Sequence, residues 1–106
     1  MTKRCYSDYV RSALCFYSRH PIGNGFRNYV DKSNWYACHN ILKNYSERDK
    51  EILTYVYGAF DTVADNVYAM ANKFQIHQNI IWNMMEKLEK KVAIERGLWY
   101  EYTQKN

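Results

Sequence analysis

The sequence contains very few of the residues that interrupt regular structure. Its 106 residues include one proline, Pro21, and four glycines, of which Gly23 and Gly25 follow that proline closely. Tight turns and hairpins depend on such residues, because they supply fixed or positive φ angles. A chain with so few of them cannot connect many short strands, so the sequence predicts an all-α fold.

Apolar residues recur every three or four positions along most of the chain, which is the period of a helix with one buried face. We expect Ser33 and Ser46 to cap helices through their hydroxyls, residues 20–29 to form a loop, and Leu98 to begin a tail that docks on the body. The first helix is expected to be the longest. The pattern predicts a compact bundle of about five helices in one domain over residues 1–106, at about 4–19, 33–44, 47–57, 65–74 and 77–95.

The composition bears on the compartment and on the state of the cysteines. No run of about 18 apolar residues exists, and no apolar run follows the basic start, so we expect neither a membrane helix nor a signal peptide and place the protein in the cytoplasm. An odd number of cysteines without a secretion signal argues against a disulfide framework. We therefore expect reduced thiols at Cys5, Cys15 and Cys38.

The positive charge is concentrated in the first half of the chain. The formal net charge is +4. Residues 1–45 hold seven lysines and arginines against two aspartates, a net +5, whereas residues 46–106 hold eight basic and nine acidic residues, a net −1. This distribution points to an anionic partner for the basic N-terminal part.

Neither an enzyme nor a metal site is expected from the motifs. The chain has no G-x-S-x-G, no phosphate-binding loop and no obvious pair of catalytic carboxylates. Cys38 and His39 are adjacent on a predicted helix and point apart, and with Cys15, His20 and His77 they lack the C-x-x-C or H-x-x-x-H spacing that zinc ligands need. We expect His39 to lie on a helix surface, His77 to act as a helix cap, and no cofactor.

The most specific pattern lies between Val67 and Met85 and is typical of a helix-turn-helix. Ala71 allows two helices to approach closely, Ile76 fills the space between them, and Ile81 with Met85 buries one face of the second helix. The opposite face would be free to enter a major groove, where Asn and Gln suit adenine edges. It carries Gln78, Asn79, Trp82 and Asn83.

Together with the capped segment Tyr45 to Leu53, this pattern resembles region 4 of bacterial sigma factors and the sigma-like small regulators of phages and conjugative elements. The resemblance covers about residues 45–96, with 66–74 as the first helix of the motif and 77–95 containing the recognition helix. It implies a DNA-binding transcriptional regulator of a phage or mobile element that acts beside RNA polymerase. Two positions depart from the pattern: Gln75 stands where glycine is frequent, and His77 where serine or threonine usually caps.

Residues 77–87 would read duplex DNA, with a cation among them at Lys87. Further phosphate contacts are expected from Arg4, Arg11, Lys73 and Lys91, and readers of this kind often dimerise. The alternative is a protein-interaction module, or a small inhibitor, that uses the same scaffold to bind a protein partner. A basic rim around Trp82 would favour DNA and a mixed rim would favour protein. The sequence leaves open whether the first helix covers the motif or extends away as a dimer arm.

Overall fold

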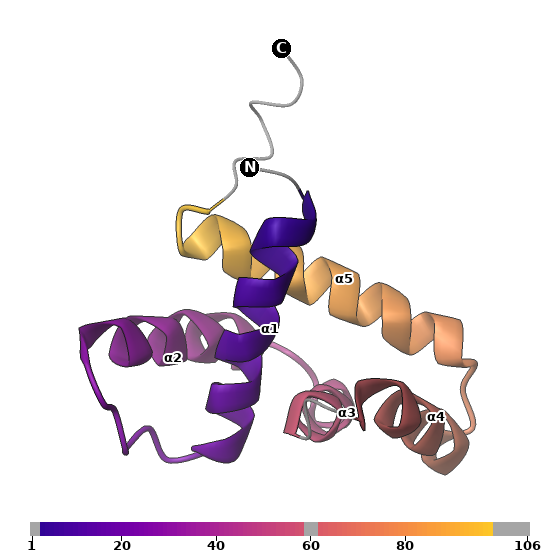
Figure 1. The fold of residues 1–106 in the computed structure, drawn as a ribbon. Coiled ribbons are helices and arrows are strands. Elements are labelled where there is room, and N and C mark those ends of the chain that lie inside the picture. Colours follow the sequence, from indigo (N-terminus) through magenta and orange to yellow (C-terminus); the bar gives the residue numbers. More distant parts are fainter. Residues whose placement is uncertain (1–2, 59–61, 99–106) are drawn as a thin grey trace.

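The computed structural model describes residues 3–58 and 62–98, with the backbone alone for residues 3–7. These residues form five helices and no strand, so the all-α prediction is confirmed (Figure 1). The helices are α1 (Lys3–Arg19), α2 (Tyr29–Leu42), α3 (Glu47–Gly58), α4 (Val63–Phe74) and α5 (Gln78–Glu95). Within the described residues, no helix combines the length and the apolar character that crossing a membrane requires.

The first helix occupies the centre of the bundle. It packs against α2, α3 and α5, while α4 packs against α3 and α5 (Figure 1). The first helix is therefore a core element and not an extended arm, and the basic N-terminal part shares one core with the motif. Within the described residues α5, at 18 residues, is one longer than α1, whereas the first helix was expected to be the longest.

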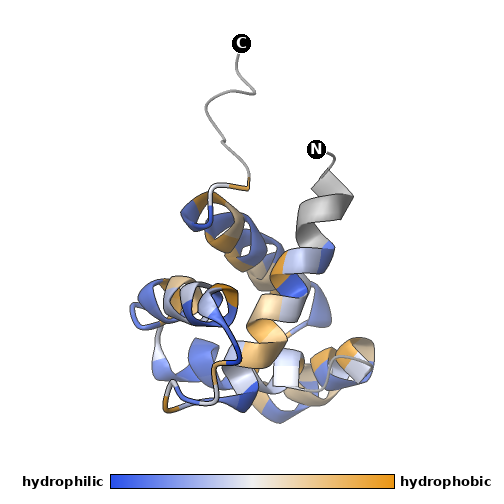
Figure 2. Cartoon of the chain, turned by 60° about the vertical axis from the view of Figure 1, so that its left-hand side comes forward, coloured by the Kyte–Doolittle hydropathy of each residue, from blue (hydrophilic) through white to orange (hydrophobic). Residues whose placement is uncertain are grey.

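One apolar core is built from all five helices. Each helix contributes apolar residues at a spacing of three or four, and hydrophilic and hydrophobic positions alternate along the ribbons of Figure 2. Burying each large aliphatic side chain contributes about 1.5–3 kcal/mol relative to exposure. The side chains with 1% exposure or less are Val10, Leu14, Cys38, Leu42, Ile52, Leu53, Val56, Tyr57, Val67, Ile81, Met85, Leu88, Val92 and Ala93.

The second helix begins four residues before the predicted start at Ser33. Asn28 is the N-cap, because its side-chain oxygen accepts a 3.0 Å hydrogen bond from the backbone N–H of Asp31. The Asp31 carboxylate in turn binds Arg27, whose Nε lies 2.9 Å from Oδ2. These contacts extend the helix toward the loop, so Ser33 lies inside α2.

The other helix ends follow the sequence more closely. The Ser46 hydroxyl accepts a 3.1 Å hydrogen bond from the backbone N–H of Asp49, which confirms the predicted cap of α3. The fourth helix begins at Val63, two residues earlier than predicted. Leu98 packs partly buried against the core, and its N–H donates a 2.8 Å hydrogen bond to the Ala93 carbonyl. The rest of the tail, residues 99–106, lies outside the described residues.

Trp35 organises a second, aromatic cluster that the sequence analysis did not identify. Its Nε1 donates a 2.7 Å hydrogen bond to the His20 carbonyl, and its ring stacks on His39 at 4.8 Å between centroids. Gly23 lies against the same ring with a φ of +66°. His39 also lies 3.3 Å from the Tyr17 hydroxyl, so it is a packing residue and not merely a surface one. This cluster fixes the loop of residues 20–28 on α1 and α2.

Candidate functional site

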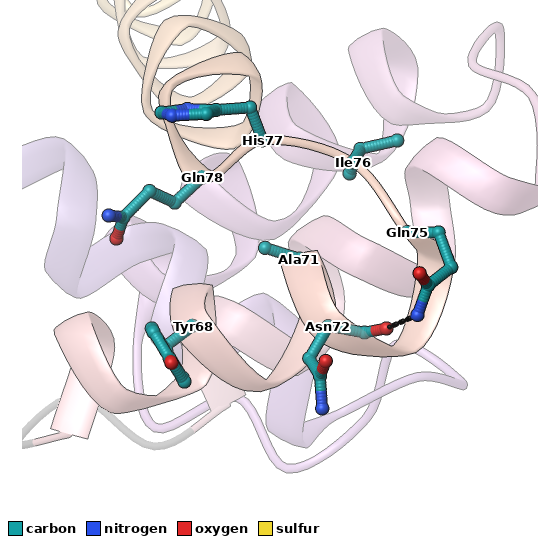
Figure 3. A pocket seen from close by; sticks show the side chains of 7 residues that line it. All are labelled: Tyr68, Ala71, Asn72, Gln75, Ile76, His77 and Gln78. Carbon is teal, nitrogen blue, oxygen red and sulfur yellow. Dashed lines mark hydrogen bonds between the residues drawn. The ribbon is translucent and has the colours of Figure 1, made fainter.

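The fourth and fifth helices are joined by three residues, and we call α4, this turn and α5 the α4/α5 motif. Gln75, the first turn residue, adopts the left-handed conformation with φ 56° and ψ 46°. No other non-glycine residue in the described part of the chain has a positive φ. The side-chain nitrogen of Gln75 donates a 2.8 Å hydrogen bond to the Asn72 carbonyl (Figure 3). The turn thus has the geometry for which glycine is usual, although glutamine occupies it.

The packing residues of the motif lie where the sequence placed them. Ala71 is buried at the approach of the two helices, Ile76 packs partly buried against the core, and Ile81 and Met85 are buried. His77 is the N-cap of α5, because its Nδ1 accepts a 3.0 Å hydrogen bond from the N–H of Asn79. The predicted burial of Ile81 and Met85 and the predicted cap at His77 are confirmed.

The start of α5 presents carboxamide side chains to solvent. Gln78, Asn79 and Asn83 are exposed. The sequence analysis predicts this for the α5 face that would read DNA, and we call these three residues the reading face. Trp82 is only partly exposed and packs against the core, so the expectation that it points to the open side holds only in part. The reason is helical phase, because Trp82 lies about 60° around the helix from buried Met85.

A notch of about 410 Å³ lies between α4 and the start of α5. Figure 3 shows Gln78 of α5 above Tyr68 and Asn72 of α4, with Gln75 and Ile76 at one side. No lysine, arginine or carboxylate lines this notch. Tyr68, 68% exposed, and Asn72 were not identified from the sequence, although their spacing of four places them on one face of α4.

The structure gives Arg11 a role inside the bundle. Its Nε donates a 2.8 Å hydrogen bond to Oε2 of Glu89, which ties α1 to α5. The same oxygen accepts a 2.6 Å hydrogen bond from the Tyr57 hydroxyl of α3. The sequence predicted Arg11 as a phosphate anchor, but its guanidinium already binds this nearly buried carboxylate.

Two of the other predicted anchors, Lys73 and Lys91, contact side chains of other parts of the chain. Lys73 is paired with Glu51 of α3. The Lys91 ammonium lies 3.5 Å from the Tyr45 hydroxyl and 5.2 Å from its ring centroid, and it is about 20 Å further along α5 than Gln78. Lys87 is exposed and has no ion pair with any residue that the structure describes. Arg4 belongs to α1, and its side chain is outside the part of the chain that the structure describes.

The rim of the reading face is therefore mixed in charge. On α5 itself, exposed Glu86 directly precedes exposed Lys87, so a negative charge accompanies the cation. A rim without net charge attracts phosphates weakly, because affinity for DNA grows with the number of unpaired cations in contact.

In the described residues no cluster of three or more metal-ligating side chains exists.

Comparison of the chain with protein-family models, with curated proteins and with solved structures gave no match.

Proposed function

We propose that the α4/α5 motif binds duplex DNA and that the protein is a transcriptional regulator of a phage or mobile element. The observation that carries the proposal is the left-handed turn at Gln75. This turn sets α5 so that Ile81 is buried while Asn79 and Asn83 are exposed near its beginning. Such an arrangement lets one helix face enter a major groove while the other packs on the core. DNA and RNA polymerase would meet the protein in the cytoplasm.

The exposed carboxamides define what this face would read. An Asn or Gln side chain can donate to and accept from one adenine edge, and each such pair contributes about 1–3 kcal/mol of discrimination. Lys87 would contact a phosphate on the flank. Because few unpaired cations lie near, we expect affinity to fall only gently with salt.

The test is selection from a pool of random duplexes at low salt, followed by affinity measurements on the selected duplex. We expect Asn79→Ala and Asn83→Ala each to weaken binding by about 1–3 kcal/mol, roughly five- to 150-fold. Asn44→Ala is the matched control, because this exposed carboxamide follows α2 and lies beside Lys91, about 18 Å further along α5 than Asn79. No selected duplex and no binding at low salt would overturn the proposal.

A second candidate, a protein-interaction module, is favoured by the mixed rim and by the exposed ring of Tyr68. Tyrosine and tryptophan at an uncharged notch are typical anchors of protein interfaces. RNA polymerase is the partner that the sigma-factor resemblance implies. Co-elution with purified polymerase, lost in Tyr68→Ala and retained in Tyr55→Ala, together with no DNA binding, would support this candidate over the first.

A further inference from the structure

One exposed ridge of α2 alternates aromatic and basic side chains. Tyr29, Lys32, Tyr36, Asn40 and Lys43 follow one another at spacings of three or four, which places them in one row along the helix and the residue after it. All five side chains are exposed, Tyr29 to 83% and Tyr36 to 46%. We call this row the α2 ridge. It spans about 21 Å, at about 1.5 Å for each residue.

One of the two tyrosines of the ridge, Tyr36, is supported by neighbouring aromatic rings. The ring of Tyr36 meets Trp35 edge-on at 5.1 Å between centroids and Phe26 at 6.4 Å. Trp35 is itself held by its hydrogen bond to the His20 carbonyl. A ring supported in this way loses little freedom when a flat ligand stacks on it.

No carboxylate of α2 neutralises the lysines of the ridge, whereas exposed Glu95 of α5 lines a hollow together with Asn40. Asp31 is the only acidic residue between Asp8 and Glu47 in the sequence. It is nearly buried, and its carboxylate binds Arg27. Lys32 and Lys43 therefore project from a surface without an exposed carboxylate from its own helix, and they attract a polyanion.

We propose that the α2 ridge binds single-stranded nucleic acid, with phosphates on Lys32 and Lys43 and bases stacked on Tyr29 and Tyr36. A polyanion without rings would need only the cations, whereas exposed tyrosines between the lysines match a strand that carries both phosphates and unpaired bases. Paired bases in a duplex do not offer their faces to such rings. The proposal does not depend on the α4/α5 motif, which uses other residues.

The test uses a fluorescent oligothymidine of 20 nucleotides and the duplex that it forms with complementary oligodeoxyadenosine. Dextran sulfate serves as a polyanion without bases. Anisotropy titrations at several salt concentrations compare the intact chain with Tyr29→Ala, Lys32→Ala and Tyr55→Ala. Tyr55 is the matched control, because it is 51% exposed on α3, outside the ridge. Circular dichroism verifies that each variant folds; Tyr29 is so exposed that its removal leaves the core intact.

We expect the single strand to bind more tightly than the duplex, and Tyr29→Ala to weaken single-strand binding about tenfold while Tyr55→Ala leaves it unchanged. Lys32→Ala should lower the slope of log affinity against log salt by about 0.7. No single-strand binding at low salt, an equal effect of Tyr29→Ala and Tyr55→Ala, or dextran sulfate binding as tight as the oligonucleotide would each overturn the proposal. The effect of Asn79→Ala on binding of the selected duplex tests only the proposed function of the α4/α5 motif.

Discussion

The Tyr57 hydroxyl on α3 donates a 2.6 Å hydrogen bond to Oε2 of Glu89 on α5, inside the core. Glu89 is 3% exposed, and the same oxygen receives the guanidinium of Arg11 from α1. A carboxylate at this depth is costly unless it is paired and hydrogen-bonded. The contact therefore holds α5 against α1 and α3 at one point.

Removal of this hydroxyl alone should destabilise the fold. Tyr57→Phe keeps the ring and deletes one hydrogen bond to a charged acceptor, so we expect the free energy of unfolding to fall by about 1.5–3 kcal/mol. Urea unfolding followed by circular dichroism measures the change. Tyr55→Phe, on the exposed side of the same helix, should change it by less than about 0.5 kcal/mol. Equal effects of the two variants would contradict the assigned role.

Arg11 should matter for stability and not for DNA affinity. Arg11→Ala removes the guanidinium that is paired with the nearly buried Glu89 carboxylate, and because the arginine is partly exposed we expect a loss of about 1–3 kcal/mol. Thermal unfolding gives the loss, and titration with the selected duplex at a temperature where the variant is folded gives the affinity. Arg48→Ala, which breaks an exposed pair with Asp49, is the comparison and should cost at most about 1 kcal/mol. A stable Arg11→Ala variant with weakened DNA binding would reverse this assignment.

The left-handed turn residue offers a stabilising substitution. Gln75→Gly relieves the steric cost of a side chain at φ 56°, so we expect a gain of about 1 kcal/mol, reduced slightly by the lost hydrogen bond to Asn72. Gln75→Val places a β-branched side chain at the same φ and should lower the melting temperature. If both variants melt at the temperature of the parent, the turn does not have this conformation in solution.

Gly23 should tolerate no side chain. A Cβ there would lie 2.9 Å from the Trp35 ring, and the φ of +66° disfavours L residues, so Gly23→Ala should cost about 1–3 kcal/mol. Tryptophan fluorescence should change with it, because the indole must shift. Gly58→Ala is the control: a Cβ there meets nothing within 4 Å, and within a helix alanine is expected to stabilise by up to about 1 kcal/mol.

Stability should fall in alkaline solution. Burial raises the pKa of the Cys38 thiol from about 9 to about 12, so the unfolded chain loses this proton at a lower pH than the folded one. The stabilisation is complete below about pH 9 and is lost as the pH rises toward 12, by up to about 1.4 kcal/mol for each pH unit. Burial also raises the pKa of Tyr57, which adds to the loss at higher pH.

Urea unfolding at pH 8, 9 and 10 measures this dependence. Cys38→Ala removes the thiol and leaves a cavity, so this variant should be less stable than the parent at pH 8. Its free energy of unfolding should change less between pH 9 and pH 10 than that of the parent, because no thiol titrates. A parent and a variant that lose stability in parallel over this interval would show that another group titrates.

Much of the fold follows from local sequence. The period of apolar residues predicts all five helices, because a helix buries one face at every third or fourth position whatever it packs against. The caps at Ser46 and His77 act within three residues of themselves, so they too are visible in the sequence. The start of α2 was misplaced because Asn28 competes with Ser33, and the contact of Arg27 with Asp31 favours the earlier cap.

The candidate site also has features that follow from local sequence and features that depend on how the helices pack. The sequence by itself determined the helices, the turn and the face of α5 on which Asn79 and Asn83 lie, since these depend on residues close together in the chain. Only the tertiary structure decided that Arg11 binds Glu89, 78 residues away, that Lys73 pairs with Glu51, and that Lys91 lies against Tyr45. The physical reason is that helical period sets which side of a helix is polar, whereas the partner of each charge depends on how the helices pack.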